Sequence, residues 1–166
     1  TGVKMIRRPT VDEYFIIQAM HASSRGSCQR RRVGAILTND KNHVIATGYN
    51  GPPAGEPNCT DQPCEGANAP SGTMLHACRA THAEHNAIIQ CPNIFNVKTA
   101  YVTASPCEQC IEKLLKTSCQ RIVFLQEYPH PAAKIRWIES GRDIDWIFDL
   151  IDDKSPVHMF AKIYGF

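Results

Sequence analysis

Two short groups of residues combine the side chains that bind zinc and move protons. The first group contains His82 and Glu84, and the second contains Cys107 and Cys110. A catalytic zinc needs three protein ligands and keeps one position open for water. Cys107 and Cys110 are one helical turn apart, so both sulfurs can reach one ion, and His82 supplies the third ligand from another helix. These three side chains therefore predict a catalytic zinc site.

Glu84 is placed for proton transfer rather than for binding the metal. It follows His82 by two residues, and zinc lowers the pKa of a bound water to about 7. Glu84 would accept that proton, pass it to a ring nitrogen of the substrate and then protonate the leaving amine by general acid–base catalysis. With Pro106 before the cysteines, the residues complete the pattern H-x-E … P-C-x-x-C, a signature of zinc deaminases. We therefore predict Glu84 as the catalytic residue.

Each group also has an ordinary structural interpretation. Thr81 to Glu84 fits a helix capping box, with Thr81 as the cap and Glu84 three residues later. A C-x-x-C pair alone is as typical of a redox pair or half of a structural zinc site as of a catalytic one. The two groups occur once each, and each begins a predicted helix, where the helix dipole favours thiolates and carboxylates. This combination favours catalysis.

Hydrophobic patterning predicts the elements that hold these residues. Helices are expected at about 10–21, 81–90, 106–116 and 131–140, and strands at 33–37, 43–47, 98–103, 121–125 and 143–148. This order predicts an α/β protein with three layers, in which helices cover both faces of one five-stranded mixed sheet. The segment 50–74 is rich in Pro and Gly and predicts a long irregular loop. The residues after Asp149 carry only weak signals.

Length and composition narrow the class of protein. The 166 residues predict a single domain over 1–166, with 1–9 and 150–166 as candidate tails. The chain is 43% hydrophobic and 20% charged, which indicates a globular rather than a disordered protein. No apolar run approaches the roughly 20 residues of a membrane helix, and no secretory leader is visible. Eight cysteines beside His and Glu favour metal thiolates over disulfides, and hence a reducing, cytoplasmic location.

The sequence resembles the deoxycytidylate (dCMP) deaminases of the cytidine deaminase superfamily over about residues 10–150. Besides the two zinc groups, the resemblance rests on 27–28, 33–35, 46–51, 58–59, 85–88 and 101–103. It implies the cytidine-deaminase-like fold and the conversion of dCMP and water to dUMP and ammonia, which supplies dUMP for thymidylate synthesis. His82 argues against a free cytidine deaminase, which typically has Cys there. The tRNA adenosine deaminases share the histidine but are less similar around Gly51 and through 52–78.

The resemblance also implies residues that bind nucleotides. Substrate-binding residues are expected at Asn50, which maps onto the asparagine that bonds the substrate sugar, and at Ser105 and Tyr128. The Asn50–Gly51 pair is equally typical of a turn, and Tyr128 of a partly buried aromatic. The family is commonly a hexamer, activated by dCTP and inhibited by dTTP, and Mg²⁺ would accompany a triphosphate. The implied effector site comprises Gly48, Tyr49, Asn50, Gly51, Arg31 and Arg32.

The arginine run Arg30–Arg32 leaves two interpretations open. It can bind a phosphate, from either the substrate or an effector. It is also typical of a solvated charged stretch before a strand.

The remaining cysteines suggest a second, structural zinc that ties down the long loop. By resemblance, its expected ligands are Cys28, Cys59, Cys64 and His76, with Cys78 as the substitute. The alternative is a set of ordinary buried thiols. Cys91 and Cys119 are expected in the core.

Two other functions remain as alternatives. A deaminase of the same fold acting on tRNA or single-stranded nucleic acid needs a basic channel lined with aromatic rings. The net charge of +2 and the 8% aromatic content argue against it, so no stable nucleic acid partner is expected. A non-catalytic zinc module would use Glu84 only as a helix cap.

Overall fold

One five-stranded sheet lies at the centre of the fold. The structure, a computed structural model, describes residues 5–70, 72–74 and 78–166. The strands are β1 (Gly34–Thr38), β2 (Val44–Tyr49), β3 (Thr99–Ala104), β4 (Arg121–Gln126) and β5 (Asp143–Trp146), in the order β2-β1-β3-β4-β5. β1 is antiparallel to both of its neighbours, whereas β3, β4 and β5 are parallel. The sheet is therefore mixed, as the sequence predicts.

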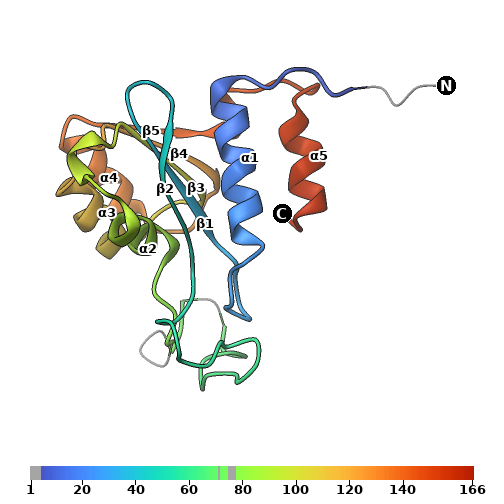
Figure 1. The fold of residues 1–166 in the computed structure, drawn as a ribbon, viewed down its shortest axis with the longest axis vertical. Helices are drawn as coiled ribbons and strands as arrows, with labels where there is room; N and C mark the ends of the chain where they lie inside the picture. The colour runs from blue at the N-terminus through green and yellow to red at the C-terminus, as the bar shows by residue number, and fades with distance from the viewer. Residues whose placement is uncertain (1–4, 71, 75–77) are drawn as a thin grey trace.

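Helices cover both faces of this sheet (Figure 1). Helix α1 (Val11–Ser23) packs with α5 (Pro156–Ile163) on one face, and α2 (Ala83–Gln90), α3 (Glu108–Leu115) and α4 (Pro131–Glu139) lie on the other. The predicted three-layer α/β/α architecture is thus confirmed. Within the described residues, no helix combines the length and apolarity needed to cross a membrane.

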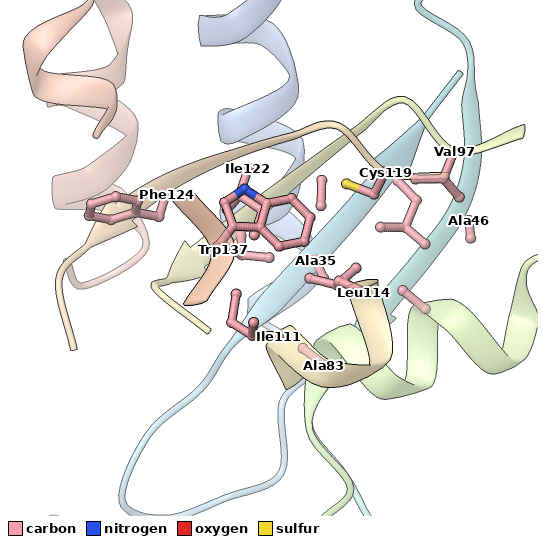
Figure 2. Packing of buried hydrophobic residues seen from close by; sticks show 14 of the residues in the cluster. Ala35, Ala46, Ala83, Val97, Ile111, Leu114, Cys119, Ile122, Phe124 and Trp137 are labelled. Carbon is pink, nitrogen blue, oxygen red and sulfur yellow. The ribbon is translucent and has the colours of Figure 1, made fainter. Parts of the chain in front are cut away.

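Each face of the sheet has its own apolar core. On the α2–α4 side, Trp137 is fully buried against side chains that include Ile122 and Leu114 (Figure 2). Its indole nitrogen donates a hydrogen bond of 2.6 Å to the carbonyl of Asp143, so burying this large ring leaves its N–H satisfied. The other core packs α1 and α5 on the sheet through residues such as Ile16 and Val157. Each fully buried aliphatic side chain contributes about 1.5–3 kcal/mol.

Helix α1 lies unusually close to β1 because Gly34 has no side chain. A Cβ at this position would lie 2.0 Å from the carbonyl oxygen of Ala19 and 2.6 Å from the backbone nitrogen of Ser23. Both atoms belong to the helix backbone and cannot move independently. Glycine at 34 therefore sets the distance between α1 and the sheet.

The C-terminal segment departs most from expectation. The weak signals after Asp149 predict a candidate tail, but this segment contains helix α5. Its N-cap is Ser155, whose side chain accepts a hydrogen bond from Val157 N, and Pro156 begins the helix. The predicted strand to 148 ends at Trp146 and continues as a short 3₁₀ turn, Ile147–Asp149. A Ser-Pro pair before a short amphipathic stretch is only a weak indication of a helix. A helix of eight residues is marginal by itself, so α5 depends on its packing against α1.

Glu13 joins the starts of α1 and α5. It completes the predicted capping box, because Thr10 Oγ1 accepts from Glu13 N and Glu13 Oε1 accepts from Thr10 N at 2.8 Å. The same carboxylate, only 1% exposed, accepts from Ser155 Oγ and forms an ion pair of 2.8 Å with Arg7. Burial by itself would raise the pKa of Glu13. The hydrogen bonds outweigh that effect and lower the pKa to about 2.

We expect Glu13→Gln to destabilise the protein by about 2 kcal/mol, the usual worth of hydrogen bonds to a charged group. Because the folded-state pKa lies below the usual value of 4.5, the carboxylate stabilises the fold above about pH 4.5, and this contribution is lost as the pH falls toward 2. Urea unfolding at several pH values measures both effects. The matched control is Glu139→Gln, the same change at an exposed position of α4. Equal stability of the two variants at pH 7 would contradict the proposed role of Glu13.

Candidate active site

The predicted site residues meet at one edge of the sheet. Asn50 follows β2, Ser105 follows β3 and Tyr128 lies just beyond β4. β1 is antiparallel to β3, so the residues before β1, including Arg31, come to the same edge. Helices α2 and α3 also begin at this edge. In α/β proteins, ligand sites commonly lie beyond the carboxyl ends of the strands. Residues from five separate segments thus form one site.

Three of the predicted ligands lie close enough to bind one metal ion. The Nδ1 atom of His82 is 3.3 Å from Cys110 Sγ and 3.5 Å from Cys107 Sγ, and all three ligand atoms lie within 4.8 Å of one another. Tetrahedral zinc with bonds of ~2.0–2.3 Å requires ligand separations of about 3.5–3.8 Å. In the described part of the chain this is the only such group of three. The donor set and the spacing therefore fit zinc.

The ligands sit at the N-caps of two helices but do not cap them. His82 precedes α2 and Cys107 precedes α3, and neither makes a side-chain capping hydrogen bond. The capping-box interpretation of residues 81–84 is therefore wrong, because the N-cap is His82. Thr81 instead exchanges two backbone hydrogen bonds with Gly51. This bridge fixes the backbone of the residue that directly precedes His82.

The electrostatics of the group favour a metal thiolate. Hydrogen bonding from Cys110, together with that from His82, lowers the pKa of the Cys107 thiol to about 3. A hydrogen bond to Cys107 in turn raises the pKa of His82. Cys110 has a raised pKa, because it shares a hydrogen bond with Cys107 and is buried. Cys107 therefore ionises first, and a cation in this group would compensate the charge of both sulfurs.

Glu84 lies inside the site with its carboxyl buried. Its side chain is 4% exposed. Burial raises the pKa of Glu84, while hydrogen bonding to Cys110 and the charge of His82 act in the opposite direction. The net effect is a raised pKa, so this carboxyl holds a proton more strongly than a solvated glutamate does, as suits a group that transfers protons.

Helix α2 is seated on β2 by Gly48. A Cβ at Gly48 would lie 2.2 Å from the carbonyl oxygen of Ala83 and 2.6 Å from the backbone nitrogen of Ala87. Gly48 thus contacts α2, and Gly51 is also buried, in the bridge to Thr81. Of the four residues Gly48–Gly51, only Tyr49 is exposed, and Arg25 lies 5.8 Å over its ring.

Asn50 links the strand edge to the arginine loop. Its Oδ1 accepts from Val33 N at 2.9 Å and its Nδ2 donates to the carbonyl of Arg31 at 2.7 Å. An amide has two donor hydrogens and two acceptor lone pairs, so these two hydrogen bonds leave one donor and one lone pair of Asn50 unused. These two hydrogen bonds tie the end of β2 to the segment before β1, and the chain leaves β2 through the Gly51–Thr81 bridge rather than through a turn at Asn50.

Ser105 holds the backbone of Tyr128. Its hydroxyl accepts from Tyr128 N at 2.7 Å and donates to Tyr128 O at 3.1 Å. The Tyr128 ring contacts Arg31, whose guanidinium carbon lies 4.6 Å from the ring centroid, and His130, whose ring centroid lies 4.4 Å away. His130 carries no specific signal in the sequence, because a lone histidine before a Pro-initiated helix is common. Ser105 thus positions the backbone of Tyr128, because the Ser105 hydroxyl both accepts and donates a hydrogen bond there.

The cysteines of the long loop lie close to one another and to the segment that contains Cys28. Cys59 Sγ lies 3.6 Å from Cys64 Sγ, and a backbone hydrogen bond from Gln29 reaches Cys59, which brings Cys28 into the neighbourhood. Cys78 acts electrostatically on Cys64. His76 lies outside the described residues. Cys119 is fully buried and Cys91 is half-buried against the core, as expected.

The chain is similar in sequence to known deaminases. Residues 9–126 match the family described as the cytidine and deoxycytidylate deaminase zinc-binding region. The chain is 36% identical over 125 residues to a deoxycytidylate deaminase of Saccharomyces cerevisiae. This alignment covers 74% of this chain and 40% of the yeast protein. It is also 36% identical over 126 residues to a deoxycytidylate deaminase of Mycobacterium phage D29, covering 72% and 98% of the two chains. The chain thus spans well under half of the yeast relative but nearly all of the phage one.

A solved structure shares the fold. The chain superposes on the crystal structure of dCMP deaminase from the cyanophage S-TIM5 in complex with dCMP and dUMP with a TM-score of 0.67. The match covers 84% of this chain and 98% of the phage chain at 21% identity. The predicted cytidine-deaminase-like arrangement of sheet and helices is therefore confirmed.

Proposed function

We propose that this chain, which belongs to the cytidine and deoxycytidylate deaminase family, is a zinc-dependent hydrolase. It would convert dCMP and water to dUMP and ammonia. The observation that carries the proposal is the group of His82, Cys107 and Cys110 within 4.8 Å, with the buried carboxyl of Glu84 hydrogen-bonded to one of its sulfurs. The names of the relatives support dCMP as the substrate. As part of pyrimidine metabolism, the product would supply thymidylate synthesis.

The proposed reaction divides the work among this chain's own residues. His82, Cys107 and Cys110 would hold a zinc ion, which acidifies a water when bound. Glu84 would accept one proton from the attacking water and deliver it to the ring nitrogen, and would then take the second proton of the same oxygen and give it to the amine, which leaves as ammonia when the C–N bond breaks and the carbonyl forms. Asn50 offers its free amide donor and acceptor to the sugar, and Tyr128 offers its ring to the base. Ser105 keeps Tyr128 in place.

The test is ammonia release from four substrates: dCMP, dCTP, cytidine and a tRNA. We expect dCMP to be deaminated fastest. A faster reaction with the tRNA would favour the nucleic-acid deaminase, and no reaction with any of them in zinc-loaded protein would favour the non-catalytic module.

Regulation and assembly form a second part of the proposal. The family resemblance supports a cytoplasmic hexamer that dCTP activates, with Mg²⁺ on the triphosphate, and that dTTP inhibits. The exposed Tyr49 ring, stacked under Arg25, and the exposed Arg32 are the members of the expected effector set that a nucleotide can reach. An effector acts by binding one state of an oligomer better than another. Rates that rise sigmoidally with dCMP and become hyperbolic with dCTP are the expected signature.

We propose a second, structural zinc in the long loop, with Cys28, Cys59, Cys64 and either His76 or Cys78 as ligands. The contact of Cys59 with Cys64 and the approach of the Cys28 segment support it. Four thiolate or imidazole ligands form a closed structural site.

Purified protein should therefore contain about two zinc ions per chain. Cys59→Ser should remove one zinc and lower the melting temperature, because the loop depends on the metal. Cys91→Ser, at a half-buried thiol outside the cluster, is the control. Metal content comes from elemental analysis, and a wild-type protein with a single zinc, unaffected by Cys59→Ser, would exclude the second site.

A further inference from the structure

The side chain of Asn86 joins two segments of the candidate site. Asn86 is half-buried in α2, four residues after His82. Its Nδ2 atom donates a hydrogen bond of 2.8 Å to the carbonyl of Tyr49 and one of 3.3 Å to the carbonyl of Thr81. Both partners are carbonyl oxygens, which only accept, so the amide nitrogen must face them. Its two hydrogens are thus shared between the end of β2 and the segment before α2.

Each of these carbonyls belongs to a peptide bond that leads into a site residue. The carbonyl of Tyr49 lies in the peptide unit that carries the N–H of Asn50. The carbonyl of Thr81 lies in the unit that carries the N–H of His82. A peptide unit is planar, so a hydrogen bond to its oxygen also restricts the direction of the N–H that follows. Asn86 therefore holds the backbone that carries a metal ligand and the backbone that carries the expected sugar-binding residue.

Neighbouring contacts support the same link. Thr81 and Gly51 exchange two backbone hydrogen bonds, of 2.8 and 3.1 Å. The absence of a side chain at Gly48 lets α2 lie close to β2, which brings the last carbonyl of β2 within reach of the short Asn86 side chain. In the part of the chain that the structure describes, this is the only side-chain hydrogen bond that joins α2 to β2. The orientation of α2 on the strand end thus depends on one amide.

We propose that Asn86 is a positioning residue, which fixes Asn50 and His82 relative to each other and so keeps the sugar of the substrate in register with the metal centre. This inference rests on the proposed deaminase function. Asn86 acts through the two residues that it positions. A substrate held between two parts of a site reacts well only if their spacing is kept, and a displacement of about 1 Å costs roughly 100-fold in rate.

The first experiment compares kcat/KM for dCMP, per bound zinc, in wild type, Asn86→Ala and Asn86→Gln. Alanine removes both hydrogen bonds but favours a helix, so α2 should still form. We expect kcat/KM to fall about 100-fold in Asn86→Ala. Asn86→Gln keeps both donor hydrogens on a side chain longer by one methylene group and should restore part of the activity. Asn96→Ala, at an exposed asparagine in the short 3₁₀ turn before β3, is the control.

A double-mutant cycle with Asn50→Ala shows whether Asn86 acts through Asn50. Changes at coupled residues have effects that do not add. Once Asn50 has lost its amide, Asn86→Ala should lower kcat/KM further by less than about 10-fold. Single-turnover measurements with excess enzyme keep the slow variants measurable. Asn86→Asp keeps the shape of the side chain but replaces the donor nitrogen by an acceptor oxygen, and it takes the place of Asn86→Ala should that variant lose zinc.

The outcomes separate this inference from the proposed function. A wild type that does not deaminate dCMP would refute the function, and the inference with it. An active wild type together with an Asn86→Ala variant that melts at a lower temperature but keeps wild-type kcat/KM would show that Asn86 only stabilises α2, and would overturn the inference alone. An undiminished loss from Asn86→Ala in the Asn50→Ala background would also overturn it, because Asn86 would then act independently of Asn50.

Discussion

Glu84→Gln should retain zinc and lose most turnover of dCMP. The amide has nearly the same shape as the carboxyl, so the buried position in α2 remains filled. It cannot accept a proton from water and return it to the substrate. General acid–base catalysis is typically worth 10²–10⁴-fold, so kcat should fall by roughly 100-fold or more. Because the change removes proton transfer rather than binding, the affinity for dUMP should change little.

The measurement combines steady-state kinetics with metal analysis. Glu112→Gln, the same change at an exposed position of α3, is the control and should keep wild-type kinetics. Near-normal turnover in Glu84→Gln at wild-type zinc content would remove Glu84 from the proposed mechanism. Loss of zinc together with activity would show that the carboxyl supports the metal rather than the proton transfer.

Gly48→Ala should displace α2 and damage both stability and activity. Its Cβ would enter the helix backbone, 2.2 Å from Ala83 O and 2.6 Å from Ala87 N. Neither atom can rotate away, so α2 must shift from the sheet by close to 1 Å. Overpacking of this kind costs about 1–3 kcal/mol. The shift carries His82 and Glu84 with it, and a misplacement of about 1 Å costs roughly 100-fold in rate.

Thermal unfolding, zinc content and kcat of Gly48→Ala test this expectation together. Thr47→Ala, at the exposed neighbouring position of β2, is the control. Wild-type stability and zinc content in Gly48→Ala would show that α2 does not depend on this close approach. Sensitivity to dCTP in Thr47→Ala should remain, because this change does not touch Tyr49.

The order and type of most elements could be predicted because their signals are local. The α1 capping box needs only Thr10 and Glu13, three residues apart, and the structure forms both of its hydrogen bonds. The end of α4 follows from Gly141, which adopts a left-handed conformation with φ of 84°. Helix α5 was missed because its eight residues bury only one face, and the partner of that face, α1, lies more than a hundred residues earlier.

The candidate metal ligands could also be identified from the sequence. His82, Cys107 and Cys110 carry side-chain chemistry that few other roles require, and helical spacing alone brings the two cysteines together. The role of Gly48 could not be identified in this way. The resemblance associated it with an effector, whereas the structure packs it against Ala83 and Ala87, a contact that depends on how α2 crosses β2.

What the sequence alone determined is thus the chemistry of the candidate site: which side chains can bind zinc, which carboxyl can move a proton, and which arginines can meet a phosphate. Tertiary structure decided the environment of each. It buried Glu84, pinned Tyr128 through Ser105, engaged Arg30 with the loop and left Arg31 stacked and without an ion-pair partner among the described residues. Residue type and spacing set what a side chain can do, but burial and partners arise from contacts between segments far apart in the chain, and these exist only once the sheet has assembled.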